Sequence, residues 1–287
     1  MHSYQIITDS GCDLTAEEYA RLAVTCVPLS VEFRGNVQDD RNDESLKDFY
    51  SGLRSGESAK TAAVNPEGWK RFMERHLNRG QDLLVLTFSS GLSATAQSAR
   101  IAAEELGEVY PQRKILVADT LCASMGQGLL LWYACRLRDA GRSLEEVYDW
   151  VQTHKLNLCH WFTVDDLFFL KRGGRISGAT ALLGTMLNIK PVLHVDDEGH
   201  LVSVGKARGR KAAIEALAQK TAQLGAGFDN SVMFISHGDC LEDAQYLAGL
   251  LRERYGAKEV LINYVGAVIG SHSGPGTLAL FFLGTHR

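Results

Sequence analysis

The sequence predicts an α/β protein of two domains, with a ligand bound between them. We expect residues 1–156 to form an N-terminal α/β domain on a parallel sheet, and residues 157–287 a C-terminal α+β domain. Strand and helix patterns alternate through the first half, which is typical of parallel sheets with crossover helices. After residue 156, hairpin and helical connections mix. The 287 residues, 45% of them hydrophobic, are enough for two modest cores.

The first half contains four extended segments and several amphipathic helices. Apolar patterns predict strands at 4–8, 24–33, 83–88 and 114–118, and helices at 46–53, 66–77 and 122–138, with another helix after residue 95. Thr15 and Glu18 form a capping box, as do Ser143 and Glu146, and each marks a helix start. The polar segment 36–43 is predicted as a loop.

The second half has more strands and shorter connections. Patterns predict strands at 159–164, 190–195, 201–204, 231–236, 259–264 and 277–282, and helices at 165–172, 179–187, 211–224 and 244–255. Gly173 and Gly174 end the first of these helices, and residues 196–199 form a turn.

Composition excludes several classes of protein. A net charge of −4 argues against nucleic-acid binding over the whole surface, although it allows a local basic patch. No apolar run reaches the roughly 18 residues of a transmembrane helix, and the N-terminus lacks signal-peptide features, so we expect a cytoplasmic protein. The six cysteines show no CxxC or zinc-ligand spacing, so we expect thiols and neither a metal site nor a cofactor.

The segment 89–95, SSGLSAT, follows an apolar strand and opens a helix. The first N–H groups of a helix lack internal partners and attract anions. Ser93 and its neighbouring hydroxyl residues add further donors, and Gly91 allows close approach of the backbone. The segment predicts a site for a carboxylate or phosphate, although a simple polar loop with a hydroxyl cap fits it equally well.

Two further segments carry candidate functional groups. In GSHSGPGT (270–277), three glycines and a proline predict a tight exposed turn, with His272 as an anion donor or general base, or else merely a turn. KRGGR (171–175) and ARGRK (207–211) fit either a helix end and a solvated face or a basic surface for a phosphate-bearing partner. The chain contains no GxSxG, Walker A or HExxH motif.

Together these segments resemble the DegV family. The resemblance covers nearly the whole chain and rests on TDSGCDL (8–14), SSGLSAT (89–95), DDLFFLKRGGRIS (165–177), IKPVL (189–193), ARGRKAA (207–213) and IGSHSGPGT (269–277). It implies a protein that holds a long-chain fatty acid in a closed tunnel and presents the carboxylate to a separate ATP-dependent fatty-acid kinase. By the family motifs, Thr61, Ser93 and His272 bind the carboxylate, and Arg172 and Arg208 belong to the kinase-facing surface.

This chain departs from the family pattern at two places. Family members commonly have TSQPS where this chain has TAAVN (61–65), so Ala62 replaces a serine beside Thr61. The family GLSGT is GLSAT here, and the Cβ of Ala94 is expected at the carboxylate site. The apolar stretch 179–189 is a candidate tunnel wall, and it fits ordinary core packing as well.

Two alternatives to a non-catalytic lipid carrier remain open. Ser93 as nucleophile and His272 as base would suit an acyl-transfer enzyme, although the sequence offers no clear third member to orient the histidine. A carrier of another small acid or phosphorylated metabolite would use the same anion site without a long apolar extension.

Overall fold

The computed structural model describes residues 4–176 and 188–287, and its first sheet is the predicted parallel one. Four parallel strands run in the order β2-β1-β6-β7. These strands are β1 (Tyr4–Asp9), β2 (Thr25–Val27), β6 (Asp82–Thr87) and β7 (Ile115–Asp119). Short segments η1 (Ser10–Cys12) and α1 (Ala16–Arg21) connect β1 to β2.

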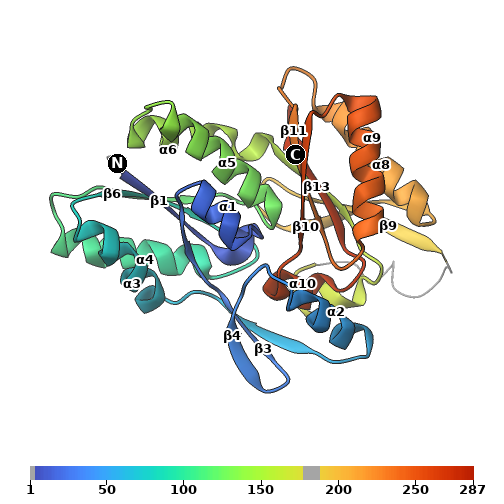
Figure 1. Ribbon diagram of the computed structural model, residues 1–287, viewed down its shortest axis with the longest axis horizontal. Coiled ribbons are helices and arrows are strands. Elements are labelled where there is room, and N and C mark those ends of the chain that lie inside the picture. The colour runs from blue at the N-terminus through green and yellow to red at the C-terminus, as the bar shows by residue number, and fades with distance from the viewer. Residues whose placement is uncertain (1–3, 177–187) are drawn as a thin grey trace.

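Helices cover both faces of this sheet (Figure 1). These helices are α3 (Pro66–Leu77), α4 (Thr95–Val109), α5 (Met125–Asp139) and α6 (Leu144–His154). Alternate residues of β6 enter different cores, because successive side chains of a strand point to opposite faces. Leu84 and Leu86 pack with α5 and α6, whereas Leu83 and Val85 pack with α3 and α4. The uninterrupted apolar run of β6 is therefore explained by burial on both sides.

The second sheet has six strands in the order β10-β9-β8-β13-β11-β12, and only β11 and β12 are parallel neighbours. The strands are β8 (Leu158–Thr163), β9 (Ile189–Val195), β10 (Leu201–Arg208), β11 (Val232–His237), β12 (Glu259–Tyr264) and β13 (Leu278–Leu283). Helices α8 (Arg210–Leu224) and α9 (Leu241–Tyr255) cover one face. The segments η2 (Lys155–Asn157) and α7 (Phe168–Arg172) flank β8.

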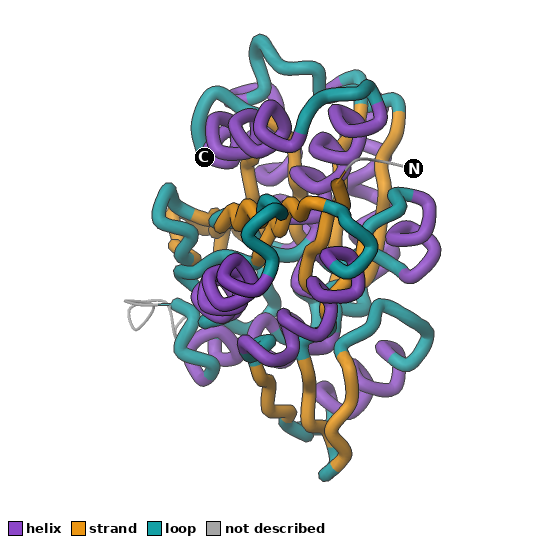
Figure 2. Tube along the Cα trace, turned by 90° about the vertical axis from the view of Figure 1, so that its left-hand side faces the viewer, coloured by secondary structure: helices purple, strands orange, loops and turns teal. Residues whose placement is uncertain are grey.

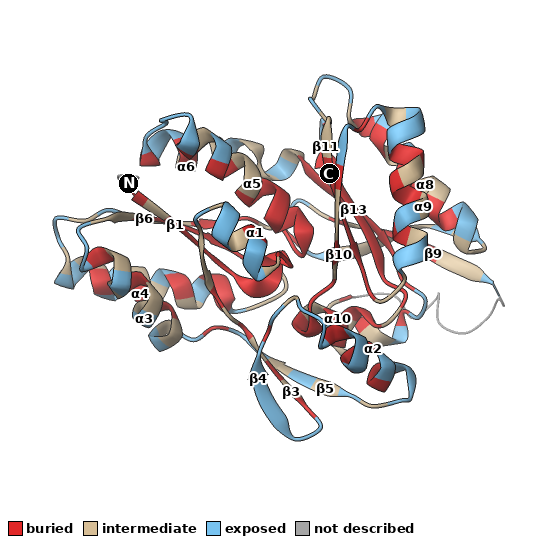
Figure 3. Ribbon diagram, viewed as in Figure 1, coloured by how far each residue is buried: buried red, intermediate tan, exposed pale blue. Residues whose placement is uncertain are grey.

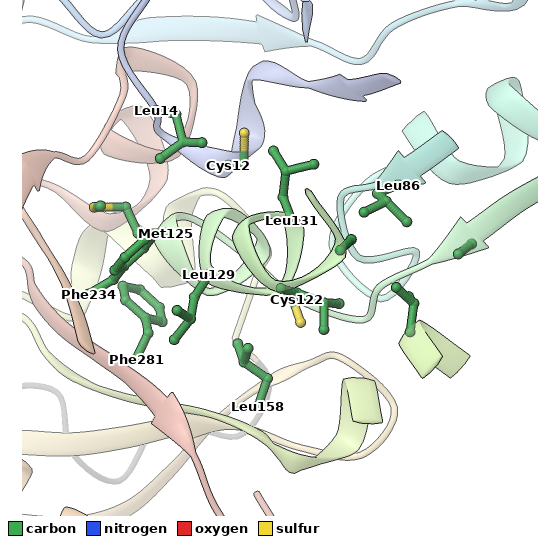
Figure 4. Packing of buried hydrophobic residues seen from close by; sticks show 14 of the residues in the cluster. Cys12, Leu14, Leu86, Cys122, Met125, Leu129, Leu131, Leu158, Phe234 and Phe281 are labelled. Carbon is green, nitrogen blue, oxygen red and sulfur yellow. The ribbon is translucent and has the colours of Figure 1, made fainter. Parts of the chain in front are cut away.

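Helix α5 joins the two large sheets into one core. Figure 4 shows Met125 and Leu129 of α5 beside Phe234 and Phe281 of the six-stranded sheet. The same cluster includes Leu86 of the parallel sheet. Close packing of this kind holds both sheets at fixed positions on either side of α5. The predicted domain boundary between 156 and 157 stays a prediction.

A third sheet was not predicted from the sequence. The antiparallel strands β3 (Ser30–Phe33), β4 (Asn36–Asp39) and β5 (Ala59–Ala62) pair in the order β4-β3-β5, and Figure 2 shows them below the other two sheets. Residues 36–39 were assigned to a loop, which is wrong. All four side chains of β4 are exposed, so the strand lacks the apolar alternation on which the prediction depended.

Helix α10 (Ala267–Ser273) replaces the turn predicted at residues 270–277. The helix is followed by Gly274, whose φ of 78° is a conformation that favours glycine. Helix α10 packs on α2 (Leu46–Arg54), α7 and β5. Figure 3 shows α10 as mostly buried. The motif therefore lies inside the molecule, where His272 faces neighbouring elements.

The single strand predicted at 24–33 is wrong, because this segment forms β2 of the parallel sheet and β3 of the third sheet. Most other element predictions are confirmed, including both capping boxes and the helix 66–77. The helix expected at 179–187, and most of the tunnel wall expected at 179–189, lie outside the described residues. In the described part of the chain, no helix is both long and apolar enough to cross a membrane.

Candidate functional site

An inner cavity of about 260 Å³ lies where the three sheets meet α10. Apolar side chains from all parts of the chain form its walls, among them Leu29, Phe88, Phe162, Leu170, Val195 and Phe281. It is larger than the roughly 150 Å³ apolar cavities that hold benzene. Thr61, Ser93, Ala94 and His272, which the sequence predicted as one binding site, all line it.

The four predicted residues mark the mouth of the inner cavity. Thr61, Ser93 and His272 are half-buried, and Ala94 is exposed. By contrast, Phe281 is 2% exposed and Leu170 is 1% exposed. The polar groups therefore lie at the end of the cavity that solvent reaches, and the apolar walls lie behind them.

Thr61 and His272 contact each other directly. The Oγ1 atom of Thr61, on β5, lies 2.9 Å from Nε2 of His272, on α10. Gly173 makes this position of the ring possible, because a Cβ at residue 173 would lie 2.3 Å from Nδ1 of His272. The sequence analysis did not predict β5, so it did not predict this contact between Thr61 and His272.

Ser93 lies at the start of α4, as predicted. Its Oγ pairs with Oγ1 of Thr95 at 2.9 Å and accepts a hydrogen bond from the Thr95 N–H at 3.3 Å. Ala94 is the N-cap of α4 and makes no side-chain capping bond, so the helix end keeps N–H groups for a ligand. Ala94 has a φ of −73°, an ordinary helical value, so its backbone does not require the glycine of the family pattern.

The other hydroxyls of this loop serve other contacts. Ser89 is fully buried and donates to the Gly199 carbonyl at 2.9 Å, which ties the loop to the turn between β9 and β10. Ser90 is exposed and is not part of the cavity wall. Of the hydroxyl groups from which the site was inferred, only that of Ser93 lines the cavity.

Arg175 is a site residue that the motif transfer left out, although it belongs to the quoted KRGGR segment. Its Nε donates to the Leu92 carbonyl at 3.2 Å and its Nη1 to the Gly173 carbonyl at 2.6 Å, which holds the guanidinium beside the mouth. Burial, together with the positive charges of Arg175 and Arg172, lowers the pKa of His272 to about 4. His272 is therefore a neutral imidazole near pH 7, and Arg175 adds a cation that the predicted site residues did not include.

A second depression, the outer pocket, adjoins the mouth and measures about 360 Å³. It shares Thr61, Arg175 and His272 with the inner cavity. Its remaining wall is formed by Ser58, Ala59, Lys60, Arg172, Gly173 and Ser271. Three cationic side chains therefore surround the end of the site that faces solvent.

The arginines of the KRGGR and ARGRK segments differ in exposure. Arg172 is exposed and lies 4.9 Å from the ring centre of Phe169, and Arg208 is exposed at the end of β10. Arg210 is instead partly buried, and its Nε donates to Asp243 at 2.8 Å. The basic surface suggested by the ARGRK segment therefore does not include Arg210.

Two buried carboxyl groups hold the N-terminal end of α10. Asp13 accepts from the Gly266 N–H at 2.9 Å, and Asp40 accepts from the Val268 N–H at 3.1 Å. Burial raises the pKa of both groups, that of Asp40 to about 6. His272 lies near the other end of α10. Asp13 and Asp40 therefore help to fix the orientation of His272, although they are far from it in the sequence.

No cluster of potential metal ligands occurs among the described residues. Asp9 and Asp119, the last residues of β1 and β7, serve as backbone acceptors: Asp9 accepts from the Phe88 N–H at 2.8 Å and Asp119 from the Ser90 N–H at 3.2 Å. All six cysteines are free thiols. These carboxylates therefore fix the ends of neighbouring strands and loops.

Comparison with known proteins indicates the same family as the sequence motifs. Residues 3–285 match the family described as "Uncharacterised protein, DegV family". This chain belongs to the DegV family. A DegV domain-containing protein of Clostridium perfringens is 43% identical over 99% of this chain and 98% of its own length. The family assignment thus covers both large sheets and α10.

Solved structures of DegV proteins share the whole fold. A Thermus thermophilus protein described by its fatty-acid binding is 34% identical, with a TM-score of 0.88 over 99% of this chain and 100% of that one. A Thermotoga maritima protein, whose structure is reported to reveal a fatty-acid binding function, is 28% identical, with a TM-score of 0.85 over 99% and 100% of the two chains. Both therefore match the entire architecture described above.

The hydrogen-bond partners of Ser93 and His272 argue against the acyl-transfer alternative. A serine nucleophile needs a base within hydrogen-bond reach. The described contact of Nε2 in His272 is to Thr61, while Oγ of Ser93 pairs with Thr95. The arrangement suits donation of hydrogen bonds to an anion better than activation of Ser93.

Proposed function

We propose that the protein binds one long-chain fatty acid in the inner cavity, with the carboxylate at Thr61, Ser93, His272 and the backbone of Ala94. The observation that carries the proposal is the convergence of these residues on one apolar cavity. The fatty-acid binding stated for the Thermus thermophilus and Thermotoga maritima proteins supports it.

The physical chemistry of a fatty acid suits the two ends of the site. Burying ten methylenes at about 0.8 kcal/mol each contributes roughly 8 kcal/mol before the costs of binding, so the tail supplies most of the affinity. A carboxylate at the mouth needs donors to offset its lost hydration. The Ser93 and Thr61 hydroxyls, one N–H of neutral His272 and the nearby Arg175 guanidinium can supply them.

We further propose that the bound carboxylate is presented to a separate ATP-dependent fatty-acid kinase, which forms the acyl-phosphate. In this proposal the protein itself is a non-catalytic binding component without a cofactor. The outer pocket supports it, because Lys60, Arg172 and Arg175 place positive charge where a phosphoryl group would approach the carboxylate. Exposed Arg172 and Arg208 are the residues proposed to contact the kinase.

Extraction of the natively purified protein tests the binding proposal. The protein is denatured, extracted into organic solvent, and its acyl content measured by mass spectrometry against protein concentration. We expect about one fatty acid per chain, either as purified or after incubation with hexadecanoate. Absence of any acyl chain in both samples would rule out the proposal.

A further inference from the structure

Three carboxyl groups, which we call the acid cluster, are buried close together behind α10. Asp9 is 0% exposed, Asp13 is 1% exposed and Asp40 is 4% exposed. Among the described residues, no lysine, arginine or histidine forms an ion pair with any of the three. A buried carboxylate without a counter-charge has a high free energy, and a bound proton lowers it. The acid cluster is therefore expected to keep protons to an unusually high pH.

Two members of the acid cluster lie on either side of the start of α10. Gly266 is the N-cap of this helix, and a Cβ there would lie 2.7 Å from Oδ1 of Asp13 and 3.3 Å from Oδ1 of Asp40. The same two oxygens accept hydrogen bonds from the Gly266 and Val268 N–H groups. Like charges repel strongly where water is excluded. The two carboxyl groups therefore hold α10 together most firmly while at least one of them carries a proton.

Asp9 is connected to this pair through its neighbour in the sequence. Ser10 donates from Oγ to Oδ2 of Asp40 at 2.9 Å, and Asp9 accepts from Nε2 of Gln127 at 3.3 Å. Burial raises the pKa of Asp9 to about 7, that of Asp40 to about 6 and that of Asp13 well above its ordinary value. The negative charge of Asp40 raises the pKa of the other two further.

The titratable groups that face the acid cluster from other elements are also acids. Asn263 of β12 donates to the Asp13 carbonyl at 3.1 Å and to the Glu18 carboxyl group at 2.7 Å. The others are thiols and a phenol whose pKa burial raises, so they are neutral near pH 7: Cys12 of η1, Cys26 of β2 and Tyr50 of α2. Helix α5 and its N-cap contribute the non-titrating side chains of Gln127 and Ser124. Protons therefore take the place of a counter-charge here.

The groups at the mouth do not change charge between pH 6 and 8. His272, with a pKa of about 4, is neutral throughout this range. Thr61 and Ser93 contribute hydroxyl groups, and the Arg175 guanidinium stays charged. A pH dependence of affinity in this range therefore reports on groups away from the mouth.

We propose that the acid cluster is a proton-dependent hold on α10, which positions His272 for the fatty acid and loosens as the pH rises from 6 to 8. The inference rests on the proposed fatty-acid site and adds a form of regulation to it. An arrangement that exposes the carboxyl groups to water binds protons less tightly than the observed one. Removal of protons therefore favours the looser arrangement, and fatty-acid affinity is highest at the acid end of this range.

The pH profile of binding tests this inference. Hexadecanoate affinity of the delipidated full-length protein is measured by calorimetry between pH 6 and 8, where a carboxylic acid in water is ionised. Release of one proton predicts a fall of roughly 5- to 10-fold in the wild type. Asp40→Asn keeps an acceptor for the Val268 N–H and cannot titrate, so the fall should shrink to about threefold or less. Asp39→Asn, at an exposed neighbour, should keep the wild-type profile.

Hydrogen exchange without fatty acid provides a second measurement on the wild-type protein. After correction for the intrinsic effect of pH, the Gly266 and Val268 amides should exchange roughly 5- to 10-fold faster at pH 8 than at pH 6. The Leu217 amide of α8, which packs on the six-stranded sheet, serves as the reference and should show no such change. This measurement stands even if Asp40→Asn does not fold.

The outcomes separate the inference from the proposed function. A hexadecanoate affinity that is constant from pH 6 to 8 would overturn the inference and leave the fatty-acid site standing. A profile of Asp40→Asn as steep as that of the wild type would assign the pH dependence to other groups and contradict the inference as well. If no acid binds at any pH, the proposed function fails, while the exchange of the Gly266 and Val268 amides still decides whether the hold on α10 depends on a proton.

Discussion

The inner cavity and the outer pocket share Thr61, Arg175 and His272, yet their chemistry is opposite. Behind these residues the walls are mostly apolar and buried, whereas in front of them Lys60 and Arg172 add positive charge. The difference indicates two separable tasks. The inner side is suited to holding an apolar chain, and the outer side to bringing a second anionic group to the carboxylate.

Blocking the inner cavity should have the largest effect. Ala279 lines the cavity and is 7% exposed, so Ala279→Phe would place a ring where the chain is expected. Displacing about three methylenes costs roughly 2.4 kcal/mol, or about 60-fold in affinity for hexadecanoate by calorimetry. Octanoate, which needs less of the cavity, should lose much less. Equal losses for both acids would show that the chain does not pass Ala279.

Removing the Ser93 hydroxyl should weaken binding next most strongly. A hydrogen bond to a charged group is worth about 1.5–3 kcal/mol, so Ser93→Ala should reduce hexadecanoate affinity roughly 10- to 100-fold. Ser90→Ala is the matched control, because Ser90 lies in the same loop, exposed and away from the cavity wall. Comparable affinities for the two variants would remove Ser93 from the proposed carboxylate site.

A change in the outer pocket should affect phosphorylation and leave binding intact. Arg172→Ala removes an exposed cation of the outer pocket, and we expect acyl-phosphate formation by an added fatty-acid kinase to fall roughly tenfold. Hexadecanoate affinity should remain within about twofold. Arg79→Ala, at an exposed arginine outside the outer pocket, serves as the control. A loss of affinity with no change in phosphorylation would reverse the division of tasks.

The smallest effect is expected at Ala94. Its backbone is helical, so Ala94→Gly relieves no strain and removes only a methyl group at the exposed mouth. We predict a change in hexadecanoate affinity of about threefold or less, measured in the same titration. A larger gain would show that the methyl group obstructs the carboxylate.

The sequence predicted the regions of regular apolar pattern better than it predicted the mouth. The parallel sheet followed from runs such as residues 83–88, because burial on both faces leaves an unbroken apolar segment. Strands β4 and β5 have no such pattern, since their place is fixed by pairing with β3. Thr61 was found by its motif, but its contact with His272 required the missed strand β5.

Long-range contacts also explain the other omissions. The position of α10 depends on Asp13 and Asp40, more than 220 residues away along the chain, so local patterns indicated a turn instead. Arg175 acquires its role because the Leu92 and Gly173 carbonyls hold its guanidinium beside the mouth.

The state of the bound carboxylate is the most direct test of the proposed site. Carbon-13 NMR of hexadecanoate labelled at the carboxyl carbon reports its protonation between pH 5 and 8 in the complex. Hydrogen bonds and the nearby Arg175 guanidinium favour the charged form and lower the carboxyl pKa, so the account predicts a single bound resonance that does not titrate in this range. A bound resonance that titrates with a midpoint above pH 5 would place the carboxyl group in an apolar environment, away from the mouth, and contradict the account.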